Sequence, residues 1–105
     1  MKIIINNQEF IVNEANNFIK KFIGLMGKKN ITKGMFFPKT RSIHTFFMKD
    51  NIDVIMINKE KKIIYYQKNV KRNKIIIKKE AHDTIELPKN TINQDILNLY
   101  IKIIK

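Results

Sequence analysis

Short apolar runs separated by polar turns fill most of this chain, and this spacing is typical of β-strands. Near the N-terminus, Lys2–Ile5 and Glu9–Val12 flank an Asn-Asn-Gln turn, which predicts a hairpin. Ile52–Ile57 is almost entirely apolar, which indicates a strand buried on both faces. Further strands are expected at Gly34–Phe37, His44–Lys49, Lys62–Tyr66, Ile75–Lys79, Thr84–Leu87 and Leu99–Ile104.

One segment has a helical period instead. Between Phe18 and Met26, at about 100° per residue, the apolar side chains fall on one broad face with Lys20 opposite. This pattern predicts an amphipathic helix that stops at Gly27 and covers an open end or face of the sheet. The predicted fold class is α+β and mostly β: a compact antiparallel barrel- or sandwich-like sheet with one short amphipathic helix near the N-terminus. The 105 residues are expected to form a single domain, 1–105.

The composition excludes several classes of protein. Because the chain has no cysteine, disulfides, zinc–thiolate sites, iron–sulfur clusters and thiol nucleophiles are all excluded. Its apolar runs are far shorter than the roughly 18 residues that a membrane span needs, and no secretory signal pattern follows Met1. We therefore expect a cytoplasmic monomer that does not contact a membrane.

The net charge of +12 comes from 19 lysines but only two arginines, Arg41 and Arg72. Arginine is the better residue for bidentate recognition of phosphate. Lysine is accompanied here by 22 isoleucines and 13 asparagines, a combination typical of an A+T-rich genome, so the charge is weak evidence for a nucleic-acid partner. If nucleic acid binds, the expected contacts are in a lysine-rich loop, at Lys68, Lys71, Arg72 and Lys74.

The motifs predict no cofactor and no metal. His44 and His82 lack the His-x-x-x-His spacing of a helical metal site, and Gly24–Lys29 lacks the spacing of a phosphate-binding loop. Ser42 is the only serine and has no Gly-x-Ser-x-Gly frame, which argues against a serine hydrolase.

Asp53 is the most informative residue, because a carboxylate within a buried apolar strand needs partners. Backbone N–H groups, Lys49 or His44 could supply them. In one interpretation the carboxylate is structural and fixes a turn through hydrogen bonds. In the other, Asp53 and His44 form a general acid–base pair.

The connection between two expected strands decides between these interpretations. Asp50 and Asn51 alone separate His44–Lys49 from Ile52–Ile57, and so short a link predicts a tight antiparallel hairpin. Such a hairpin would hold His44 about 13 Å from the carboxylate, too far for a hydrogen bond. We therefore favour the hairpin and a structural carboxylate.

Five sequence blocks occur in a recognisable order. They are Gly24-Leu25-Met26, Gly34-Met35-Phe36-Phe37, Ser42-Ile43-His44-Thr45-Phe46-Phe47-Met48-Lys49, Ile52-Asp53-Val54-Ile55 and Glu86-Leu87-Pro88. From about Ala15 to its end, the sequence resembles the domain of unknown function 192 family of small prokaryotic proteins. The resemblance implies a β-rich domain with one helix, and it implies no reaction, cofactor or partner. Where the family usually has arginine, this chain has Lys21. Lysine keeps the positive charge but lacks the planar guanidinium fork that forms two parallel hydrogen bonds.

Three functions remain open. The first is a non-enzymatic binding or accessory domain of uncharacterised role, which takes a protein or small-molecule ligand near His44, Lys49 and Asp53. Together with Lys21 and Glu86 from the family blocks, these residues form the candidate site. The second function is a small-molecule enzyme with His44 and Asp53 as its acid–base pair. The third is a nucleic-acid-binding protein that uses its lysine-rich loops.

Overall fold

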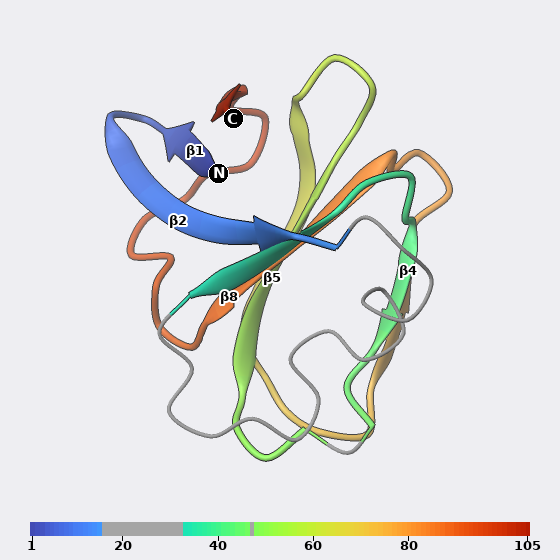
Figure 1. Cartoon of the computed structure of the whole chain (residues 1–105). Helices are drawn as coiled ribbons and strands as arrows, with labels where there is room; N and C mark the ends of the chain where they lie inside the picture. Colours follow the sequence, from blue (N-terminus) through green and yellow to red (C-terminus); the bar gives the residue numbers. More distant parts are fainter. Residues whose placement is uncertain (16–32, 47) are drawn as a thin grey trace.

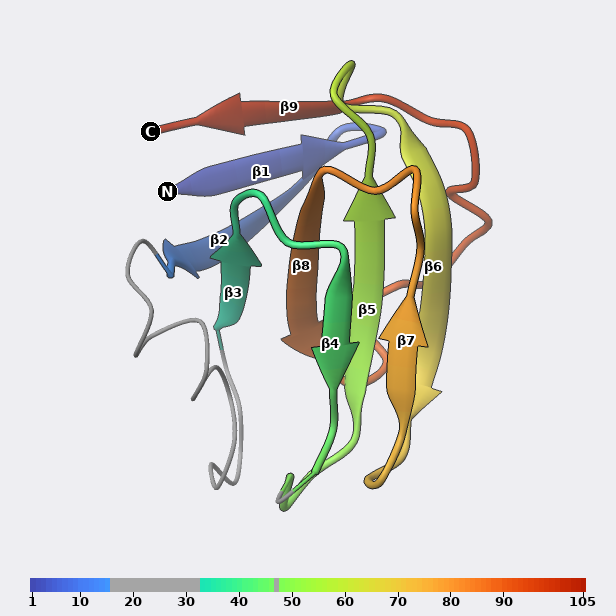
Figure 2. The same ribbon diagram turned by 90° about the vertical axis from the view of Figure 1, so that its right-hand side faces the viewer.

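The computed structural model describes residues 1–15, 33–46 and 48–105, and in these segments every regular element is a β-strand. Seven strands form one curved sheet, and two short strands form a second sheet in front of it (Figures 1 and 2). The strands are β1 Lys2–Ile5, β2 Gln8–Glu14, β3 Gly34–Phe37, β4 Ser42–His44, β5 Ile52–Ile57, β6 Ile63–Val70, β7 Ile75–Ile77, β8 Asp83–Pro88 and β9 Ile101–Ile104.

The large sheet curls until its two ends meet. Its order is β6-β5-β8-β3-β2-β1-β9, and every pair is antiparallel except β2 with β3. At one end of β6, an isolated bridge joins Lys62 to Tyr100, just before β9. The Ile63 N–H donates to the Leu99 carbonyl at 2.8 Å, and the Ile101 N–H donates to the Lys61 carbonyl at 2.9 Å. These bonds close the sheet at that end, as in a partly open barrel.

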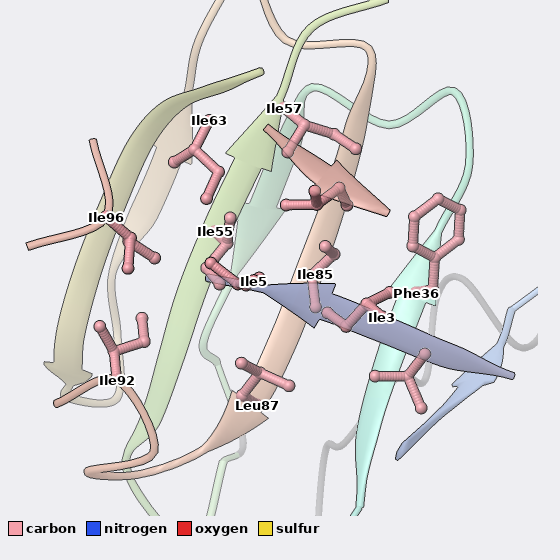
Figure 3. Close-up of a cluster of buried hydrophobic side chains, with 12 residues drawn as sticks. Ile3, Ile5, Phe36, Ile55, Ile57, Ile63, Ile85, Leu87, Ile92 and Ile96 are labelled. Carbon is pink, nitrogen blue, oxygen red and sulfur yellow. The ribbon is translucent and has the colours of Figure 1, made fainter. Parts of the chain in front are cut away.

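The central strand β5 is buried along its whole length, as its apolar sequence predicts. Ile55 and Ile57 face one apolar cluster, which the curled N-terminal and C-terminal strands enclose (Figure 3). Val54 and Met56 face a second cluster, which the β4–β7 sheet covers. Because both faces of β5 need cover, the two-stranded sheet has to lie across the large one.

Asparagine supplies most of the left-handed turns. In the described part of the chain, six of the eight non-glycine residues with positive φ are asparagines. Asn6 and Asn7, with φ of 49° and 70°, form the tight turn of the β1–β2 hairpin. Asparagine tolerates this conformation better than other side-chain-bearing residues, so a chain with three glycines uses it instead.

The predicted α+β fold class is wrong, because the described residues contain nine strands and no helix. The mostly β part of that prediction is confirmed. The expected helix Phe18–Met26 lies outside the described residues. The N-terminal hairpin and the β5–β6 hairpin are confirmed, and the second strand of each is longer than expected.

The tight hairpin expected at Asp50 and Asn51 is also wrong. The strand expected at His44–Lys49 ends at His44, and β4 pairs with β7 rather than with β5. β5 instead lies between β6 and β8. The loop between β4 and β5 therefore crosses from one sheet to the other, because the apolar β5 sequence requires a position between two strands of the large sheet. The Thr45 hydroxyl fixes this loop by donating to the Lys71 carbonyl at 2.7 Å.

Gly34 is required where β3 passes between its neighbours. A Cβ at this position would lie 2.4 Å from the Glu86 carbonyl oxygen and 2.7 Å from a Leu87 methyl carbon. We expect Gly34→Ala to lower the free energy of unfolding by about 1–3 kcal/mol, because overpacking shifts the backbone. Urea denaturation followed by circular dichroism would measure this loss. The exposed Lys33→Ala is the control, and equal stability of both variants would contradict the prediction.

Candidate functional site

The Asp53 carboxylate is completely buried and accepts three backbone hydrogen bonds. Oδ1 accepts from the N–H of Asn69 at 2.8 Å and from the N–H of Asn90 at 3.1 Å. Oδ2 accepts from the N–H of Ile92 at 2.9 Å. The carboxylate thus ties β5 to a bulge in β6 and to the loop after β8. Backbone N–H groups of this kind compensate a buried carboxylate.

Two of these donors belong to residues in the left-handed conformation. Asn69 has a φ of 54° and Asn90 a φ of 62°. Residues in this conformation turn the chain away from the neighbouring β-strand. Their N–H groups lose the hydrogen bonds between strands and need other acceptors. Asp53 supplies the acceptor, and this is the structural role that the sequence favoured.

His44 lies apart from this network, on β4 of the smaller sheet. Its Nδ1 accepts a hydrogen bond from the Phe46 N–H at 3.2 Å, and the two rings stack with centroids 5.2 Å apart. The Asp53 side chain is completely buried, and both of its oxygens accept hydrogen bonds from backbone N–H groups. The geometry therefore gives no support to an acid–base pair of His44 and Asp53.

The structure does not gather the other predicted site residues into one place. Lys49 is exposed in the loop before β5, and Glu86 is buried on β8. Lys21 lies outside the described residues. The basic residues expected to contact nucleic acid are all exposed along the end of β6 and the turn into β7, namely Lys68, Lys71, Arg72 and Lys74. Nucleic-acid binding there stays a prediction.

The described residues form an opening that sequence reasoning missed. Three loops, after β3, β5 and β7, meet at one end of the sheets (the upper end in Figure 2). They enclose an open cleft of about 640 Å³. We call it the loop cleft, and it is lined by Lys39, Arg41, Asn58, Lys59, Glu60, Lys79, Glu80, Ala81 and His82.

Asp83, at the start of β8, holds the loops around the cleft together. Its Oδ1 accepts from the Lys39 N–H at 2.9 Å, and its Oδ2 lies 3.5 Å from the Lys61 ammonium. The His82 Nδ1 lies 3.1 Å from the same Oδ1, close enough for an ion pair when the imidazole is protonated. The His82 main chain donates to the Ile57 carbonyl at 2.7 Å and accepts from the Thr40 N–H at 2.9 Å. The backbone of the cleft is therefore fixed by hydrogen bonds between loops.

The charged side chains at the cleft are available to a ligand. Four cations line it against two carboxylates: Lys39, Arg41, Lys59, Lys79, Glu60 and Glu80. Within the described segments, none of these six forms an ion pair. The residues that line the loop cleft lie far apart in the sequence, so no sequence motif marks the site. The one signal in the sequence is Arg41, one of two arginines among many lysines.

Among the described residues, no group of three or more His, Cys, Asp or Glu side chains is arranged to hold a metal ion. No helix in this part of the chain could cross a membrane.

The family model DUF192, described as "Uncharacterized ACR", matches residues 1–99 of the chain. A UPF0127 protein of Thermococcus kodakarensis is 36% identical over 80 residues, which cover 70% of this chain and 51% of that protein. A UPF0127 protein of Pyrococcus furiosus is 44% identical over 55 residues, 48% of this chain and 47% of that protein. The chain thus spans about half the length of the curated relatives it matches.

Two solved structures share the fold. One is a protein of unknown function from Novosphingobium aromaticivorans, with a TM-score of 0.78 and 12% identity over 97% of this chain and 82% of that one. The other is a putative transcription regulator from Sinorhizobium meliloti, with a TM-score of 0.78 and 18% identity over 96% of this chain and 89% of that one.

Replacing Asp53 is expected to destabilise the fold. Asp53→Ala leaves three backbone donors without their acceptor, and we expect it to lower the free energy of unfolding by roughly 3 kcal/mol or more. Asp53→Asn presents an NH₂ group to at least one of the three donors and should lower it by about 1–3 kcal/mol. Urea denaturation measures both losses. Asp50→Asn, at a partly exposed carboxylate 3.0 Å from the Lys89 ammonium, is the control and should leave the midpoint nearly unchanged. Equal midpoints for the Asp53 and Asp50 variants would contradict a structural Asp53.

Asp95 provides a pH test of the loop after β8. The Leu97 N–H and then the Tyr66 hydroxyl, each 3.0 Å from Oδ1, hold the pKa of Asp95 below its ordinary value of 3.8. A lowered pKa in the folded state stabilises the fold above the ordinary value. This stabilisation is lost as the pH falls through the folded pKa. In an NMR titration of the carboxyl carbon, Tyr66→Phe should raise the pKa of Asp95, and Tyr65→Phe should leave it unchanged. The reverse order would show that the hydroxyl bond is absent.

Proposed function

We propose, from the premise that this chain belongs to the DUF192 family of uncharacterised proteins, that the domain is a binding module for a small anionic molecule. The ligand site is the loop cleft. This proposal retains the hypothesis of a non-enzymatic binding domain. It places the ligand site at the opposite end of β4 from His44, Lys49 and Asp53.

One observation carries this proposal: three separate loops bring to one fixed cleft four cations that form no ion pair with the described residues. Like charges repel one another, and the two carboxylates of the lining balance only half of these cations. An anion in the cleft would remove that repulsion.

The size and chemistry of the cleft suit a small molecule. A volume of about 640 Å³ lies within the range of pockets that hold metabolite-sized ligands. Arg41 offers a planar fork for two oxygens of one phosphate or carboxylate, and the lysines offer single charges around it. The Asn58 side chain also lines the cleft, and its NH₂ group can donate a hydrogen bond, while its oxygen already accepts from the Glu60 and Lys62 N–H groups.

Glu60 and Glu80 set a limit on the ligand. Their carboxylates repel an anion, so the anionic group of the ligand belongs next to Arg41. A ligand with hydrogen-bond donors at its other end would pair with these carboxylates as well as with Arg41. The proposed class is therefore a small molecule with a phosphate or carboxylate at one end and hydrogen-bond donors at the other.

The two arginines provide a matched test. Titration of the protein with pyrophosphate, and separately with citrate, would be followed by NMR amide shifts at about 150 mM salt, where diffuse charge is screened. Shifts are expected in the three cleft loops. Arg41→Gln should weaken binding about tenfold or more, whereas Arg72→Gln removes the same charge far from the cleft and should leave affinity unchanged.

The two probes separate phosphate from carboxylate ligands, because the preferred group gives the lower Kd. Glu80→Gln should strengthen binding of either anion, since it removes a repelling charge. Equal weakening by Arg41→Gln and Arg72→Gln would mean that only net charge matters, and the proposal would be rejected.

A further inference from the structure

The strand β7 has one edge that no described strand covers. β7 pairs with β4 alone among the described strands. On either side of that pairing, the Lys78 N–H donates to the Arg41 carbonyl at 3.0 Å and the Thr45 N–H donates to the Lys74 carbonyl at 2.9 Å. Hydrogen-bonded pairs alternate in an antiparallel ladder. The N–H and C=O groups of Ile75 and Ile77 therefore point away from β4, toward the uncovered edge.

The same two residues expose their side chains. Ile75 is 63% exposed and Ile77 is 62% exposed, although the intervening Ile76 is buried in the second apolar cluster. Exposed isoleucines beside unpaired backbone groups form a template for another strand. A solvated surface strand more often has polar residues at these positions.

A groove runs along this edge between β7 and β6, and Figure 2 shows the two strands beside each other. Its volume is about 320 Å³, and Tyr65 and Gln67 form its β6 side. The Lys78 ammonium lies 4.4 Å from the centre of the Tyr65 ring, so a cation–π contact joins the two walls. Alternate side chains of an added strand would enter this groove, while the others would lie beside the exposed isoleucines.

We propose that the β7 edge binds an extended acidic segment of another protein by strand addition. The groove lining contains two cations, Lys74 and Lys78, and no carboxylate. Lys71 and Arg72 extend the positive charge at the turn before β7. Opposite charge directs a partner to such an edge and sets its register, and the backbone groups supply the bonds.

Charge also decides against a second copy of this chain. Antiparallel pairing of β7 with itself would place Lys74 of one copy opposite Lys78 of the other, and each copy carries a net charge of +12. Directly opposed like charges destabilise a strand pair. The lysines thus keep the apolar edge from self-association and leave it open to an acidic strand.

Binding of a capped peptide of alternating valine and glutamate would test the proposal. NMR titration at about 150 mM salt should shift the amides of β7 and the facing part of β6, with a Kd on the order of 100 μM for so short a strand. The same peptide N-methylated at alternate amides loses the backbone donors and should bind at least about tenfold more weakly. Equal binding of the two peptides would rule out strand addition.

Protein variants test the surface itself. Ile75→Thr with Ile77→Thr keeps β-branched residues, so the strand is retained while the apolar contact is lost. The expected result is about tenfold weaker binding. Ile11→Thr changes another exposed isoleucine, on β2, and should have no effect. Lys74→Glu should weaken binding of the acidic peptide and strengthen binding of a peptide that alternates valine and lysine.

Three other outcomes would overturn the proposal. Dimers in sedimentation that the paired threonine variant abolishes would identify a second copy as the occupant. Shifts of β7 amides with single-stranded DNA or RNA, and none with the peptide, would identify nucleic acid instead. Equal weakening by the β7 and β2 threonine variants would show nonspecific apolar contact. The β7 edge is separate from the loop cleft, so Arg41→Gln should not change peptide binding.

Discussion

A single buried carboxylate fixes the path of three segments in this fold. Asp53 lies on the central strand, and each of its three bonds reaches a backbone group in another segment. Since a buried carboxylate without partners is strongly unfavourable, the β6 bulge and the loop after β8 have to come to it. The carboxylate thus holds together the two segments that belong to the neighbours of β5, since β6 and β8 pair with β5 on opposite sides.

The complete burial of β5 has a second consequence, which concerns function. One face of the strand is enclosed by the curled sheet, and the other is covered by β4 and β7. Covering that face with a sheet of only two strands places three loops together at one end, where the loop cleft lies. It also leaves β7 with an edge that no described strand covers. Both proposed binding surfaces therefore follow from the need to bury both sides of an apolar strand.

The chemistry of the two surfaces differs, although both are basic. The loop cleft has an arginine fork among lysines and two carboxylates, and we propose that it binds a small anion. The β7 edge has backbone groups and exposed isoleucines between lysines, and we propose that it binds an extended chain. The high lysine content alone predicts neither surface, because its effect depends on which lysines stand beside arginine, carboxylate or apolar groups.

The sequence by itself determined the local elements. The apolar run Ile52–Ile57 required a strand buried on both faces, and Asp53 within it required backbone partners. The paired asparagines at the first turn required a hairpin. These features depend on neighbouring residues, so they can be read locally. The tertiary structure decided which strands pair, because a two-residue link is compatible with a tight hairpin and with a crossing to another sheet. It also decided the candidate site, since Arg41, Lys59 and His82 meet only after three distant loops fold to one end.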